Sequence, residues 1–116
     1  MKITLPKPPS VNHLYGRNKW GGVYLKPAAN LWIEESLWII KRLGRFEMIT
    51  TPAVLSIDFY SQLGSDVDNI LKITMDLLAK HAKIIKNDNL VHELHVKKFK
   101  CKKDEQRIEL EIEVVK

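Results

Sequence analysis

The last stretch of the chain alternates apolar and charged residues with a period of two. The alternating residues are Arg107, Ile108, Glu109, Leu110, Glu111, Ile112, Glu113 and Val114. Successive side chains of a β-strand point to opposite faces, so this pattern gives one apolar face and one charged face. Such a strand belongs to a sheet that is covered on one side and solvated on the other. The rest of the chain must therefore supply a cover for one face of a sheet.

Three further segments are predicted to be strands. Ile3 and Leu5 alternate with polar residues, and residues 54–61 are rich in β-branched and aromatic side chains. After the turn-like sequence at 86–89, Leu90, Leu94 and Val96 indicate a third segment. We expect this segment and the final strand to form an antiparallel hairpin joined across residues 101–106.

Two segments show the spacing of a helix that buries one side. In the first, apolar residues recur at helical spacing from Ala29 to Leu43. Asn30 is the expected N-cap, and Gly44 is the expected stop. The second begins near Val67 and is apolar around most of its circumference. The predicted fold is α+β: a mixed β-sheet with two helices packed on it, in the order β-α-β-α-β-β.

Composition limits the class of protein. The chain has 116 residues, which fits a single domain over 1–116, and 45% of them are hydrophobic. No apolar run is long enough to span a bilayer, and the start lacks the apolar core of a signal peptide. The one cysteine, Cys101, supplies neither a disulfide framework nor a thiolate metal cage. We expect a cytoplasmic protein with no membrane association.

The charge favours a polyanionic partner. The formal net charge is +5, and lysines and arginines release counterions from nucleic acid when they contact phosphates. Residues 6–27 are expected to be a long irregular segment that mixes cations with Trp20 and Tyr24. Two interpretations remain open: the segment grips DNA by stacking and phosphate contact, or its two rings anchor it to the core.

The segment GSDVDNILKITMD, residues 64–76, gathers acids at the start of the second helix. Asp66 and Asp68 project to the same side if the chain is still extended there, and Lys72 lies one helical turn after Asp68. Acids in a first helical turn also serve simply as caps. However, Asp68 and Lys72 lie on the only polar stripe of a mostly apolar helix. Asp88 follows in a polar turn about one helix length later, and three carboxylates together suit Mg²⁺.

The segments PPSVNHLYG, DVDNILKITMDLL and NDNLV, in this order and spacing, resemble the RusA family of Holliday-junction resolvases. The resemblance covers nearly the whole chain. It implies a homodimeric, Mg²⁺-dependent endonuclease, with Mn²⁺ as a substitute, that makes paired cuts in branched DNA, namely four-way junctions. By resemblance, Asp66, Asp68 and Asp88 are the metal-binding and catalytic acids, and Lys72 is the functionally important lysine.

The resemblance leaves some residues without a firm role. Asp76 aligns with an acid of unclear function, and Asn87 stands where some relatives carry a second acid beside Asp88. Candidate DNA contacts are Asn12, Tyr15, Arg17, Lys19, Lys26 and Lys72. The alternative functions are a non-catalytic DNA-binding protein of the same fold, and an ordinary domain whose acids only cap a helix.

Overall fold

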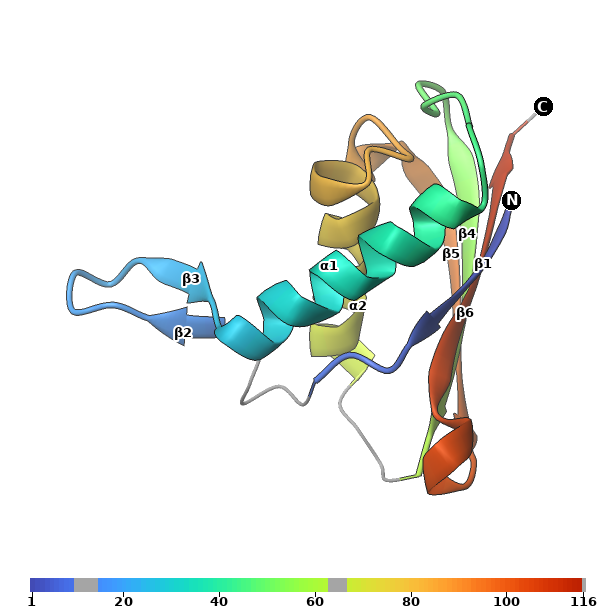
Figure 1. Cartoon of the computed structure of the whole chain (residues 1–116). Coiled ribbons are helices and arrows are strands. Elements are labelled where there is room, and N and C mark those ends of the chain that lie inside the picture. Colours follow the sequence, from blue (N-terminus) through green and yellow to red (C-terminus); the bar gives the residue numbers. More distant parts are fainter. Residues whose placement is uncertain (10–14, 63–66, 116) are drawn as a thin grey trace.

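The computed structural model describes residues 1–9, 15–62 and 67–115. Within these ranges, a mixed sheet runs in the order β1-β6-β4-β5. Its strands are β1 (Lys2–Pro6), β4 (Ala53–Ser61), β5 (Val91–Lys100) and β6 (Arg107–Val114). β4 pairs with β5 in parallel and with β6 antiparallel, and β1 pairs with β6 antiparallel. The helices α1 (Pro27–Arg42) and α2 (Val67–Asp76) lie on one side of the sheet (Figure 1). The predicted α+β class with a mixed sheet and two helices is confirmed.

The predicted hairpin between the last two strands is wrong. β4 lies between β5 and β6, so these consecutive strands are not paired. The connection contains the short 3-10 helix η4 (Lys103–Glu105) and crosses the end of β4, where Cys101 N–H donates to the Ser61 carbonyl at 3.1 Å. The clean alternation of β4 and β6 suits the centre of the sheet, whereas lysine-rich β5 suits an edge.

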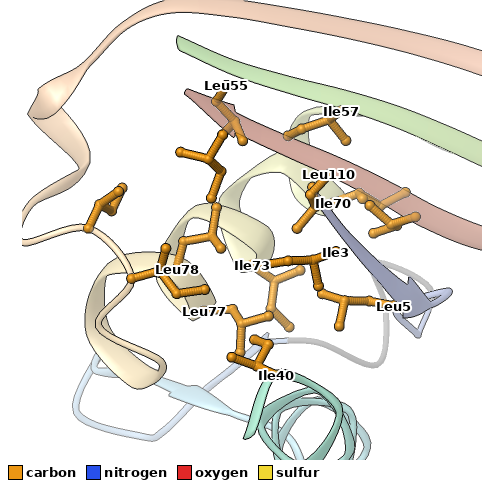
Figure 2. Close-up of a cluster of buried hydrophobic side chains, with 14 of the residues drawn as sticks. Ile3, Leu5, Ile40, Leu55, Ile57, Ile70, Ile73, Leu77, Leu78 and Leu110 are labelled. Carbon is orange, nitrogen blue, oxygen red and sulfur yellow. The ribbon is translucent and has the colours of Figure 1, made fainter. Parts of the chain in front are cut away.

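The core lies between the sheet and the helices. Every second residue of β4 is buried, from Ala53 to Ser61, and β1 and β6 bury their apolar residues on the same side. Figure 2 shows the resulting cluster, to which α2 contributes Ile70 and Ile73. Because these are spaced three residues apart, they lie on one side of the helix and orient its polar residues away from the sheet.

α1 begins earlier than predicted. Its N-cap is Lys26 rather than Asn30, and Pro27 occupies the first helical turn, where the missing N–H of proline costs nothing. Gly44, with φ of 102°, follows the end of the helix as expected, since this conformation favours glycine. Trp32 is buried and its indole N–H donates to the Pro6 carbonyl at 2.8 Å, which ties α1 to the end of β1.

The sequence had suggested that the segment between β1 and α1 is irregular, but part of it is regular. It contains an antiparallel hairpin formed by β2 (Tyr15–Arg17) and β3 (Val23–Leu25), which extends away from the sheet (Figure 1). The predicted strand order therefore lacked these two strands. The Asn18 side chain accepts hydrogen bonds from the N–H groups of Trp20 and Gly22, each at 2.9 Å, and so closes the turn. A three-residue strand is too short to leave a clear alternating pattern.

The polypeptide after α2 continues as a π-helix, η2 (Leu77–His81), and then turns back towards the sheet. Ile49 N–H donates to Ile84 C=O at 2.8 Å, and Lys86 N–H donates to Ile49 C=O at 2.9 Å. These bonds fix the path into the 3-10 helix η3 (Asp88–Leu90), which leads directly into β5. No helix in the described ranges has the length and apolar character needed to cross a membrane.

Candidate active site

The predicted site residues come from two segments. Asp68 lies in the first turn of α2, and its side chain is outside the described residues, as is the whole of Asp66. Lys72 is exposed one turn further along α2, as the sequence predicted. Asp76 is partly buried and its carboxylate lies 3.6 Å from the Lys80 ammonium, so this acid has a structural ion pair within α2–η2.

Asp88 begins η3 and is exposed. The residue before it, Asn87, is the N-cap: its side-chain oxygen accepts a hydrogen bond from Asn89 N–H at 3.1 Å. An asparagine therefore performs a definite structural task at the position where some relatives have an acid. The sequence signal for this cap is the Asn-Asp-Asn turn itself.

Asp68 and Asp88 lie towards opposite ends of the same helical unit. β4 ends at Ser61, shortly before α2, and α2 and η2 then return along the sheet to the end where Asp88 lies (Figure 1). The parallel pairing agrees, because the first residue of β5, Val91, is opposite Ala53 at the start of β4. The chain therefore does not bring Asp88 beside Asp68 within one protomer. Among the described residues, no three histidine, cysteine, aspartate or glutamate side chains gather closely enough to hold a metal ion.

The candidate DNA-contact residues lie mostly on the β2–β3 hairpin. Arg17 and Lys19 are exposed, and Lys19 Nζ lies 4.9 Å from the centroid of the Trp20 ring. Lys26 is partly buried at the start of α1. Asn12 and the side chain of Tyr15 are outside the described residues.

The hairpin decides between the two interpretations of its aromatic residues. Trp20 is 82% exposed and Tyr24 is 49% exposed, so the interpretation in which both rings anchor the segment to the core is wrong. The Tyr24 ring instead packs on Gly16, where an added Cβ would come within 2.5 Å of a ring atom. Trp20 is thus presented at the tip by a turn whose geometry Asn18 fixes.

Two comparisons with known proteins bear on the class of this protein. The family model described as Endodeoxyribonuclease RusA matches residues 6–113. The Crossover junction endodeoxyribonuclease RusA of Aquifex aeolicus (strain VF5) is 32% identical over 106 residues, which are 89% of this chain and 80% of that relative.

These similarities first define a class: the protein is an endodeoxyribonuclease, an enzyme that cuts DNA within a strand. The chain belongs to the RusA family. The sequence-based prediction of this family, and of a nuclease, is confirmed. A nuclease family of this kind suggests a divalent metal ion, for which carboxylate oxygens are suitable hard donors.

Proposed function

We propose that the protein resolves four-way DNA junctions by paired, Mg²⁺-dependent cuts, and that each of its two sites is assembled from two protomers of a homodimer. Family membership supports the reaction, because the family model describes an endodeoxyribonuclease and the Aquifex relative is named a crossover junction enzyme. The single observation that supports the assembly is the separation of Asp68 from Asp88 along α2 and η2.

The separation is too large for one ion. α2 has ten residues and η2 has five, and at a rise of about 1.5 Å per residue they span roughly 20 Å. Carboxylate oxygens that share Mg²⁺ lie about 2 Å from it. We therefore assign Asp68 and Asp88 of one chain to two different ions.

A dimer with two-fold symmetry removes this obstacle. A two-fold axis that crosses α2–η2 near its middle exchanges the two ends, so that Asp68 of one protomer faces the partner's Asp88. The same operation creates a second, equivalent site. Two symmetric sites in one dimer account for paired cuts in opposing strands.

The residues then have separate tasks. Asp66 and Asp68 of one protomer, with the partner's Asp88, would hold Mg²⁺, which would supply positive charge to neutralise the phosphate during hydrolysis. Lys72 is exposed one turn from Asp68, where its ammonium either binds the scissile phosphate or limits repulsion among the carboxylates. On the hairpin, Arg17 and Lys19 contact phosphates, and Trp20 offers a ring for stacking.

Cleavage of a synthetic four-way junction tests the proposal. We expect cutting with Mg²⁺, none with EDTA, and none by Asp68→Asn with Mg²⁺, because the variant loses an anionic ligand. Binding of the junction by Asp68→Asn should persist, since removal of a negative charge lowers repulsion of phosphate. As a matched control, Glu35→Gln removes an exposed acid of α1 and should cut at the normal rate.

Other outcomes separate the alternatives. If Asp68→Asn cuts normally, the site assignment is wrong. A wild-type protein that binds junctions but never cuts them is the non-catalytic DNA-binding protein. If the acids only cap α2, Asp68→Asn leaves cleavage unchanged, and Asp68→Ala lowers the free energy of unfolding by about 1 kcal/mol.

A further inference from the structure

The face of the sheet opposite the helices carries a column of stacked side chains across three strands. Arg107 of β6 is opposite Tyr60 of β4, which in turn is opposite Phe99 of β5. The Tyr60 and Phe99 rings are stacked, with centroids 4.9 Å apart and planes inclined by 17°. The Arg107 guanidinium carbon lies 3.9 Å from the centroid of the Tyr60 ring. A cation and two rings therefore form one continuous stack.

The inner members of this column are held in place. Arg107 Nε donates to the Glu109 carboxylate at 3.2 Å and its Nη1 donates to the Glu105 carbonyl at 2.7 Å. Partial burial, and then the neighbouring Glu109 carboxylate, raise the pKa of Tyr60, so its phenol stays neutral and its ring keeps an uncharged face. The rigid support is thus present before any ligand arrives.

Phe99 is the outer member of the column. It is 39% exposed and lies on β5, whose outer edge pairs with no strand in the described ranges. One side of its ring is covered by Tyr60. A large exposed ring at the end of a fixed stack is a place where a further flat, aromatic group can add.

The charges around the column indicate what that group belongs to. Towards the middle of the sheet, Asp58 and Glu109 are opposite one another, and Glu111 follows on β6. Beyond the column, in the other direction, the connection from β5 to β6 carries the exposed cations Lys102 and Lys103, followed by the exposed acids Asp104 and Glu105. The acids in the middle are partly offset by Lys97, opposite Asp58, and by Lys2, opposite Glu111. At the end of the sheet, Lys102 and Lys103 are the cations that phosphates flanking a stacked base can contact.

The column also lies at the end of the sheet that leads into the candidate active site. Phe99 is next to Lys100, which is opposite Ser61, the last residue of β4. From there the chain continues into α2, which begins at Val67. The column therefore lies at the end of the sheet from which the chain leaves for α2, on the face opposite the helices.

We propose that the exposed face of Phe99 is a stacking site for a base of the DNA substrate, with Lys102 and Lys103 holding the flanking phosphates. The inference rests on the proposed function for the identity of the ligand. A four-way junction suits it, because stacking of its bases is interrupted at the branch point. Base–aromatic stacking tolerates any sequence, since every base has a flat face.

Binding in EDTA tests the site separately from cleavage. The probes are four-way junctions that each carry one 2-aminopurine near the branch point, a base whose fluorescence falls when it stacks on a ring. We expect the wild type to quench at least one position. Phe99→Leu keeps an apolar side chain but no ring, so it should lose this quenching and bind about 5- to 100-fold more weakly. Phe99→Trp should retain both properties.

Two controls make the test specific. Phe46→Leu changes a ring that is similarly exposed, at 38%, but lies beside Met1 and the other end of β6, and it should bind and quench as the wild type does. Lys102→Ala should lower the slope of log affinity against log salt by about one and leave the quenching position unchanged.

The outcomes separate this site from the proposed function. If wild type cuts junctions but Phe99→Leu binds and quenches equally well, the stacking site is refuted and the ring only covers the sheet. If wild type cuts nothing with Mg²⁺, yet Phe99→Leu loses binding in EDTA, the stacking site is supported and the nuclease function fails. A wild type that binds no DNA refutes both.

Discussion

Two inactive variants should restore activity to each other if the sites are shared between protomers. Asp68→Asn removes the acid at the start of α2, and Asp88→Asn removes the acid at the start of η3, which follows the far end of the roughly 20 Å that α2 and η2 span. In a mixed dimer, the Asp88→Asn chain supplies an intact Asp66 and Asp68, while the Asp68→Asn chain supplies an intact Asp88. One of the two shared sites is then fully native, and the other carries both substitutions.

The size of the recovery follows from symmetry. Random exchange of equal amounts gives about half mixed dimers, and each of these has one native site of two. About a quarter of the wild-type number of sites should therefore return. Because one mixed dimer cuts one strand, the product should be a nick and not a paired cut.

The assay uses a supercoiled plasmid with an extruded four-way junction, in which a nick gives open circles and a paired cut gives linear DNA. The two variants carry different tags and are unfolded, mixed and refolded together, so that mixed dimers can be purified. We expect open circles from the mixture and neither product from each variant alone. The control is Asp66→Asn mixed with Asp68→Asn. This mixture should stay inactive, because each site then lacks one of the two acids that a single chain supplies before and at the start of α2. Purified mixed Asp68→Asn/Asp88→Asn dimers that cut nothing would refute the shared site.

Two further predictions concern the framework. Trp32→Phe removes the hydrogen bond to the Pro6 carbonyl and should lower the free energy of unfolding, measured in urea, by about 1–3 kcal/mol. The control Trp38→Phe changes a side chain that is 64% exposed and should alter this free energy by less than about 0.5 kcal/mol. Equal effects of the two substitutions would contradict the role of the hydrogen bond. The pKa of Tyr60 is raised above its usual value of 10.0, so the folded state holds this proton more tightly; its contribution to stability is present below about pH 10 and is lost as pH rises through the folded-state pKa. Tyr60→Phe should therefore show a smaller fall in melting temperature between about pH 9 and about pH 11 than the wild type, and an unchanged fall would contradict this.

The sequence predicted an element and its buried side correctly where the pattern within that element determines which side faces the core. Alternation at residues 107–114 identified β6, and the three-residue spacing of Ile70 and Ile73 identified the buried side of α2. It was insufficient for strand pairing: β5 and β6 are consecutive and antiparallel in direction, but β4 separates them. Which strand is a neighbour depends on how much apolar surface each can bury, and this is decided by the whole sheet.

The same reason explains why the position of Asp88 relative to Asp68 was not evident from the sequence. In the sequence, Asp88 follows Asp68 by about one helix length. The two acids would meet if the chain ran back from the end of the helix to its start before reaching Asp88. Here β5 starts at that far end, parallel to β4, and Asp88 precedes its first residue, Val91. A parallel strand pair joined by a helix thus keeps the residues before the helix apart from those after it, and the proposed dimer brings them together through a second chain in the opposite orientation.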